Sequence, residues 1–166
     1  MKWLLLALLV LIFLNFSNAV YFNIFTHSLP FGIYIKKEGI PQRGDYAASC
    51  LTVQIARYGI NRGYLTEGNC DTGTVRVLKI IKGVPGDRFV VKNGFLELNS
   101  IKYPIKKKDS LGRELKCFYP QQAGALKRDE YMLIGTFVPN SWDSRYWGPV
   151  TVQFLLKPWW IWDHEE

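Results

Sequence analysis

Residues 75–87 read VRVLKIIKGVPGD, a run of β-branched and apolar residues followed by a Pro-Gly reversal. β-Branched residues favour strands, and Pro followed by Gly favours a tight turn. We therefore expect a strand over residues 74–83 that ends in a turn. Side chains alternate between the two faces of a strand, so Lys79 shares a face with apolar residues such as Val77. This lysine either extends its amine to water or is buried, and burial would lower its pKa towards that of a general base.

On both sides of this strand, the chain reads as short strands separated by turn residues. Asn93-Gly94 lies between two apolar runs, which is the pattern of a two-residue β-hairpin. Further strands are expected over residues 33–35, 46–50, 130–138 and 148–156. The spacing of Leu51, Ile55 and Tyr58 predicts one short helix, ending at Gly59. The expected fold class is therefore mainly β.

The N-terminal segment reads differently from this β-rich body. Lys2 is the only charged residue among residues 1–22, which are otherwise mostly apolar. The segment is about long enough to cross ~30 Å of hydrocarbon as a helix, but Ser17 and Ala19 also fit a signal-peptide cleavage site. The residues alone leave open an uncleaved anchor over residues 1–22 and a signal segment cleaved after Ala19, and we expect one domain over residues 23–166. In both cases the domain is exported, and the N-terminus stays in the cytoplasm.

Composition indicates a folded, exported domain. The 166 residues are 48% hydrophobic, 15% aromatic and 21% charged, with a net charge of +7. These values suit a packed core rather than disorder. Outside the cytoplasm the positive charge favours an anionic membrane surface as partner, and no nucleic-acid-binding motif is present. Three tryptophans within residues 158–162 either cover an edge of the core or lie at a membrane interface.

Cysteines and histidines restrict the covalent and metal chemistry. An exported protein can form disulfides, and Cys50 with Cys70 would close a loop of about twenty residues. Cys117 would then be buried or a free thiol. The chain has no Cys-x-x-Cys pair, and its histidines are His27 and His164. We therefore expect neither a metal site nor a cofactor.

Ser28 is a candidate nucleophile. Pro30 biases the residue before it towards an extended conformation, which would present Ser28 on a defined backbone. His27 is adjacent in sequence, but neighbouring residues of an extended segment point to opposite faces. A lysine is therefore a more plausible base for this serine than His27.

A third polar segment reads NSWDSRYWG over residues 140–148. If this segment is extended, Ser141, Asp143 and Arg145 share one face. An Asp143–Arg145 pair could then brace the segment while Ser141 hydrogen-bonds a neighbour. Taken alone, an ordinary surface ion pair in a loop explains these residues as well.

Taken together and in this order, these segments resemble the sequence boxes of the type I signal peptidases, most closely the conjugative-transfer branch of TraF-type peptidases. The matching stretches are residues 26–34, 43–45, 78–87 and 140–149, with further similarity at 63–65, 68–70, 109 and 112–113. The resemblance covers essentially the whole exported body. It implies a signal-peptidase-like β catalytic domain behind one N-terminal hydrophobic anchor helix, with a hydrophobic surface at the membrane.

The resemblance also implies roles for individual residues. Ser28 would attack the scissile carbonyl of the substrate, and Lys79 would accept the serine proton. The backbone N–H of Ser28 and the hydroxyl of Thr26 would form the oxyanion hole. Ser141 would orient the Lys79 amine. The remaining assignments are Asp143 and Arg145 in support of that arrangement, and Phe31, Ile33 and Tyr34 along shallow pockets for small substrate residues.

Three functions stay open at this point. The resemblance favours a serine endopeptidase of the bacterial inner membrane, with its catalytic domain on the periplasmic side, that matures a conjugative pilin for a type IV secretion system. Hydrolysis and cyclisation of the product are both compatible with it. The second function is a general signal peptidase that cleaves many exported preproteins. The third is an exported scaffold domain without catalysis.

Overall fold

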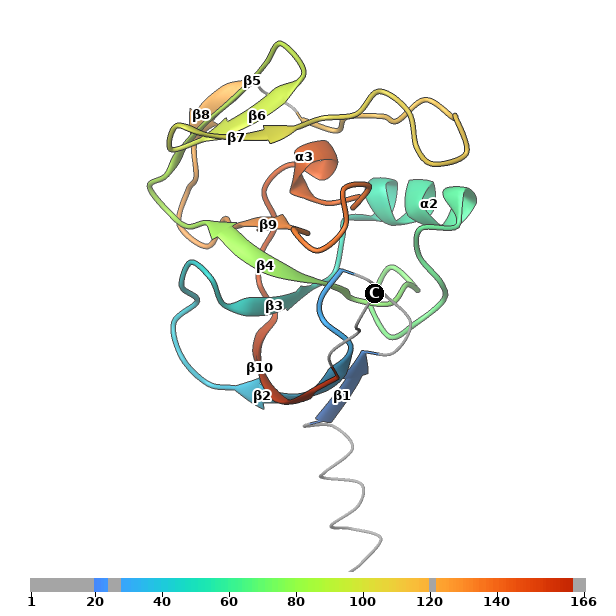
Figure 1. Cartoon of the computed structure of the whole chain (residues 1–166), viewed down its shortest axis with the longest axis vertical. Coiled ribbons are helices and arrows are strands. Elements are labelled where there is room, and N and C mark those ends of the chain that lie inside the picture. Colours follow the sequence, from blue (N-terminus) through green and yellow to red (C-terminus); the bar gives the residue numbers. More distant parts are fainter. Residues whose placement is uncertain (1–19, 24–27, 120–121, 163–166) are drawn as a thin grey trace, which may run out of the picture.

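The described residues form two antiparallel sheets and two helices. The computed structural model describes residues 20–23, 28–119 and 122–162 (Figure 1). The larger sheet has the strand order β1-β2-β10-β3-β4-β9, and the smaller has the order β7-β6-β5-β8. The strands of the larger sheet are β1 Val20–Asn23, β2 Gly32–Lys37, β3 Tyr46–Ser49, β4 Val77–Gly83, β9 Met132–Ile134 and β10 Phe154–Ile161. The remaining elements are β5 Arg88–Lys92, β6 Phe95–Leu98, β7 Ile101–Pro104, β8 Ala123–Ala125, α2 Val53–Arg62 and α3 Ser144–Trp147. The predicted mainly β class is confirmed.

The predicted anchor lies mostly outside the described residues, which begin at Val20. The three residues of the expected 1–22 segment that are described differ from the prediction. Val20 to Phe22 belong to β1 and pair with β2, because Val20 and Asn23 are buried against the sheet. Within the described ranges, no helix is both long and apolar enough to cross a membrane.

Strand β4 lies inside the larger sheet, between β3 and β9. It starts at Val77, three residues later than predicted, and its alternation of buried faces is as expected. Val77, Lys79 and Ile81 are buried on one face. The turn after β4 is closed by Asp87, whose backbone N–H donates to the Val84 carbonyl while its carboxylate accepts from the Val84 N–H. The predicted reversal is therefore present and fixes where β4 ends.

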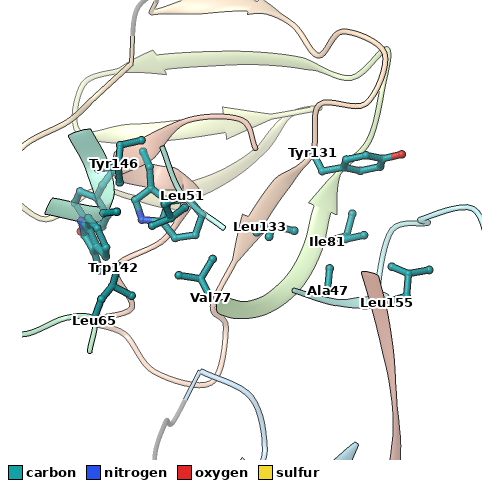
Figure 2. Packing of buried hydrophobic residues seen from close by; sticks show 13 residues of the cluster. Ala47, Leu51, Leu65, Val77, Ile81, Tyr131, Leu133, Trp142, Tyr146 and Leu155 are labelled. Atoms are coloured by element: carbon teal, nitrogen blue, oxygen red, sulfur yellow. The ribbon is translucent and has the colours of Figure 1, made fainter. Parts of the chain in front are cut away.

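The main core lies on the Val77–Ile81 face of the larger sheet. Figure 2 shows Val77, Ile81 and Leu133 gathered with Leu51 and Tyr146, which come from outside the sheet. Burying one such side chain stabilises the fold by about 1.5–3 kcal/mol. This packing holds β4 and β9 against the α2 and α3 regions (Figure 1).

Helix α2 extends three residues beyond the predicted end. Gly63, not Gly59, ends it with φ 70°, and the Gly63 N–H donates to the Ile60 carbonyl. Gly59 lies inside α2, and other side chains pack directly against its backbone. A Cβ there would lie 2.7 Å from the Leu65 Cδ1 atom and 2.9 Å from the Trp142 ring. The glycine allows close packing and does not end the helix.

The predicted hairpin is present, whereas two predicted strands are misplaced. Asn93 and Gly94 have φ values of 51° and 78°, as a two-residue turn between β5 and β6 requires. The strand expected over residues 130–138 is only β9, since the Gly135 N–H turns away to donate to a side chain. The strand expected over residues 148–156 begins at Phe154 and continues to Ile161.

The tryptophans of β10 and its end do not cover the core. Trp159 and Trp160 are each 63% exposed, and Trp162 is 41% exposed. The core-edge alternative is therefore wrong. Phe22 is 64% exposed, and it and Trp160 are both partners of Ile33 on the intervening strand. This end of the larger sheet presents an exposed apolar patch, defined here as Phe22, Trp159, Trp160, Ile161 and Trp162.

Candidate active site

Ser28 and Lys79 meet although 51 residues separate them. The Lys79 Nζ atom donates a hydrogen bond to the Ser28 Oγ atom. Lys79 comes from β4, and Ser28 comes from the turn that leads into β2. Of the two histidines, neither lies among the described residues, so the sequence-based argument about His27 is not tested.

The turn that carries Ser28 is held from several directions. The Asn23 side-chain amide donates to the carbonyls of Leu29 and Pro30, at 2.9 and 3.1 Å. The Tyr34 hydroxyl donates to the Pro30 carbonyl at 2.6 Å. Leu29 is buried in a cluster with Tyr34. Immediately after Ser28, the backbone is therefore attached to both β1 and β2.

Lys79 is buried, with 6% of its surface exposed. Burial lowers the pKa of its amine from 10.5 to about 8; Asp143 raises this pKa and Arg145 lowers it, both by smaller amounts. At pH 7 this change increases the neutral fraction of the amine about 300-fold. A neutral amine is the form that can accept the proton of a serine hydroxyl.

Behind Lys79 lies a buried ion pair between Asp143 and Arg145. Asp143 is fully buried, and its carboxylate accepts from the Arg145 guanidinium at 2.8 and 2.9 Å and from the Gly135 N–H at 2.9 Å. Arg145 also donates to the carbonyls of Pro104 and Ser141. The pair thus ties α3, β9 and β7 together next to the lysine.

The extended conformation considered for residues 140–148 is not found, because Ser144–Trp147 form α3. Asp143 caps the short helix α3, and its carboxylate accepts from the Arg145 backbone N–H at 3.0 Å. The two charged side chains meet because the capped turn brings them together, and they are buried, so an ordinary surface pair does not describe them. Asp143 and Arg145 therefore do pair, but through a helical turn and not through an extended segment.

Ser141 is buried beside Lys79. Its Oγ atom has no hydrogen-bond partner among the described residues, so the expected bond to the Lys79 amine is not formed. Both side chains lie against Gly135, where a Cβ would be 2.2 Å from Ser141 Oγ and 3.4 Å from Lys79 Cδ. Leaving such a hydroxyl unpaired costs about 1–3 kcal/mol. The Ser141 hydroxyl is therefore a buried polar group next to the Lys79 stem without a hydrogen-bond partner among the described residues.

A cavity of about 660 Å³ opens at Ser28 and Lys79, within the size range of ligand sites. The other residues along it are Tyr21, Phe22, Tyr64, Leu65, Thr66, Gly68, Asn69, Val75, Arg76, Val77, Leu78, Val138, Asn140, Ser141 and Trp142. The expected pocket residues Phe31, Ile33 and Tyr34 do not line it. Tyr34 is fully buried in the cluster on the other face of the sheet, and Tyr21 and Phe22 of the neighbouring strand β1 line the cavity instead.

The apolar wall of the cavity was missed by sequence reasoning. Tyr64, Leu65 and Trp142 all lie within stretches that match the family boxes, but nothing local in the sequence assigns them to one wall. They meet because Leu65 and the Trp142 ring both pack on Gly59 of α2. The only sequence signal for these three residues was their place within stretches that resemble the signal-peptidase boxes.

The edge of β4 beside this cavity is not paired with any strand that the structure describes. β3 pairs with β4 from Val77 to Ile80, while β9 pairs only from Ile80 onward. At Val77, Leu78 and Lys79 the side of β4 opposite β3 therefore faces the cavity. An extended peptide can add to such an edge through backbone hydrogen bonds.

A disulfide and a side-chain hydrogen bond fix two segments that contribute residues to the cavity. Cys50 and Cys70 form a disulfide that ties the loop before β4 to the end of β3, and Cys117 is an exposed free thiol. The Tyr64 hydroxyl donates to the Asp109 carboxylate at 2.6 Å. Burial opposes ionisation of Asp109, but hydrogen bonds from Tyr64 and Arg113 hold its pKa below the usual range.

The expected oxyanion donor Thr26 lies outside the described residues. The other expected donor, the Ser28 backbone N–H, is in the turn described above. The oxyanion hole therefore stays a prediction from the family resemblance.

Comparison with known proteins places this geometry in context. A family model described as "Signal peptidase, peptidase S26" matches residues 1–156. Two plasmid transfer proteins TraF from Escherichia coli are similar to the chain. One is 28% identical over 129 residues, covering 75% of this chain and 72% of the relative. The other is 26% identical over 140 residues, covering 80% and 78%. A crystal structure of a signal peptidase I from Enterococcus faecalis aligns at 20% identity with a TM-score of 0.41, covering 73% of this chain and all of that one.

Proposed function

The chain belongs to the signal peptidases of peptidase family S26, and on that basis we propose that Ser28 is its nucleophile and Lys79 its general base. The observation that carries this assignment is the contact between a buried lysine amine and a serine hydroxyl at the mouth of a cavity. Family membership supports a serine peptidase that acts on preproteins. The assignment of the two residues is our own.

In the proposed reaction, Ser28 and Lys79 carry out the bond and proton changes. Neutral Lys79 accepts the Ser28 proton as the serine Oγ bonds to the scissile carbonyl carbon. The resulting ammonium then donates this proton to the leaving amine as the peptide bond breaks. The product of this half-reaction is an acyl-enzyme on Ser28 and a free amino terminus. The Ser28 N–H and the Thr26 hydroxyl would stabilise the oxyanion.

The surroundings of Lys79 support the proposed role. The Asp143–Arg145 pair is buried and fully hydrogen-bonded, so it gives the base a rigid backing. Ser141 has an unpartnered hydroxyl next to the lysine stem, which can accept from or donate to the amine as its protonation changes.

We propose that the substrate is the precursor of a conjugative pilin. The support is the similarity to two proteins named as plasmid transfer proteins. The acyl-enzyme would then be attacked by water, which gives a linear product, or by the amino terminus of the same substrate, which gives a circular one. Family membership alone fits a general signal peptidase equally well, so the choice of substrate rests on these relatives.

We further propose that the domain works at the outer face of the bacterial inner membrane. The exposed apolar patch lies on β1 and β10, beside the point where residues 1–19 join the domain. Tryptophans are favoured at the membrane–water interface. The Cys50–Cys70 disulfide fits an oxidising compartment such as the periplasm.

The proposal is tested with the purified full-length chain and a candidate prepilin. Mass spectrometry should detect a processed product with the native chain and with Lys102→Ala, which removes an exposed lysine on β7. Ser28→Ala and Lys79→Ala should each abolish the product. Cleavage that persists in either variant rejects the proposed residue pair. A product lighter than the linear form by one water demonstrates cyclisation, and absence of any product supports the scaffold alternative.

A further inference from the structure

Arg76 is a cationic side chain in the cavity without an acidic partner. Of the residues that line the cavity, only Arg76 and Lys79 carry ionisable basic groups, and none is Asp or Glu. The Lys79 amine is already in contact with Ser28. Arg76 is half-buried and forms no ion pair with any residue that the structure describes.

The guanidinium of Arg76 is nevertheless held in place. Its Nε–H donates to the Gln153 Oε1 atom at 2.8 Å, and its Cζ atom lies 5.6 Å from the centre of the Phe154 ring. Gln153 and Phe154 are neutral, so the positive charge is oriented but not compensated. An arginine fixed in this way loses little side-chain freedom when it binds a planar, bidentate anion such as a carboxylate.

Arg76 also has a defined position relative to the reacting groups. It directly precedes the unpaired edge of β4 at Val77–Lys79. Arg76 lies three positions before Lys79, which contacts Ser28. Because paired strands advance by the same ~3.3 Å per residue, the substrate residue next to Arg76 would lie about three residues from the scissile bond. Arg76 lines the cavity together with Leu78, so it would meet a substrate side chain in this part of the cavity.

We propose that Arg76 determines specificity by binding a carboxylate of the substrate peptide about three residues from the scissile bond. The carboxylate is either an acidic side chain or the C-terminal carboxylate of a short leaving peptide. Glu67 and Asp71 are exposed members of the preceding loop and do not line the cavity, so they leave the site positively charged. This inference rests on the proposed peptidase function, because it takes the cavity to be the substrate site.

Binding to the Ser28→Ala variant tests the inference without requiring cleavage. The probe is a synthetic peptide with one Ala-Leu-Ala sequence in a chain of larger residues. A single glutamate is moved position by position on both sides of that sequence, and each peptide is compared with its glutamine counterpart. A second arm compares a free C-terminal carboxylate with its amide, so that the two sources of the carboxylate are distinguished.

We expect about tenfold tighter binding for the acid at one position or at the C-terminus, decreasing as salt is raised. Adding Arg76→Gln should bring the ratio of acid to neutral binding to about one, and Arg76→Lys should restore part of it. Arg128→Gln, which removes an exposed arginine outside the cavity, should leave the ratio unchanged. Melting temperatures of all variants check that the domain is folded.

The assignment is overturned if acid and neutral peptides bind equally at every position, or if neither binds. It is also overturned if the preference for the acid persists in Arg76→Gln. Cleavage of the same peptides by the native chain separates this result from the proposed function. Cleavage without charge discrimination leaves the peptidase standing and rejects the role of Arg76. Discrimination in binding without cleavage keeps the carboxylate site and rejects the peptidase.

Discussion

Replacing Lys79 by Met should stabilise the protein, and by an amount that depends on pH. Burial lowers the pKa of the Lys79 amine to about 8 from the ordinary 10.5. The folded state therefore disfavours the charged amine that the unfolded chain carries. At about 1.36 kcal/mol per pKa unit, this difference costs the folded state about 3 kcal/mol at pH 7.

The pH window follows from the two pKa values. Below about pH 8 the amine is protonated in both states, and the full cost is present. Between about 8 and 10.5 the unfolded chain binds more protons than the folded one, so the stability of the native protein rises with pH. The neutral Met side chain has no such dependence. The gain from Lys79→Met should therefore be largest at or below pH 7 and should shrink by about 3 kcal/mol towards pH 10.5.

The assay is urea unfolding of the full-length chain in detergent, followed by tryptophan fluorescence from pH 6 to pH 10 with the disulfide oxidised. Lys102→Met, an exposed substitution on β7, is the control and should show no pH-dependent difference from the native chain. A Lys79→Met difference that stays constant over this range refutes the claim that the folded protein lowers the pKa of Lys79. Retained peptidase activity in the same variant would refute its role as base.

Three further outcomes follow from the site. The kcat/KM for peptide cleavage should rise about tenfold per pH unit up to the pKa of about 8 for Lys79 and then level off, and a flat profile below pH 8 contradicts a lysine base. Arg145→Leu leaves the buried Asp143 carboxylate without its partner and should cost about 3–5 kcal/mol of unfolding free energy; a loss below 1 kcal/mol by urea titration would show that the pair is not buried in solution. Cys70→Ser removes the disulfide to Cys50, which closes a loop with a sequence separation of 20, and should lower the free energy of unfolding by about 3 kcal/mol. A reducing agent should lower the free energy of unfolding of the native chain by the same amount. The reducing agent should have no further effect on the variant.

Lys79 could be predicted from sequence more directly than Ser28 for a physical reason. The alternation of a strand is a local property, so the apolar neighbours of Lys79 already indicate a buried face. Ser28 has no such local pattern. Its place depends on the strand order β2-β10-β3-β4, in which a strand from the end of the fold separates β2 from β3. Only the family resemblance linked the two residues before the fold was known.

The cavity wall shows the same limit. Leu65 and Trp142 are far apart in sequence and meet on the bare backbone of Gly59, which local spacing interprets as a helix end. The tight turn at Asp143 depends on hydrogen bonds to Gly135 and Arg145, and the polar pattern of that segment fits an extended chain as well. Contacts between segments that are distant in sequence determine both the cavity wall and the turn at Asp143.

The position of β10 has a consequence for when the protein can become active. β2, which follows Ser28, pairs with β1 and β10, and β10 in turn pairs with β3 on the side that leads to Lys79. β10 follows every other strand of the fold in chain order (Figure 1). The hairpin that bears Ser28 can therefore join the sheet that bears Lys79 only after β10 has been synthesised. Under the function proposed above, the catalytic pair would therefore assemble only once β10 is in place, and an incomplete chain would lack peptidase activity.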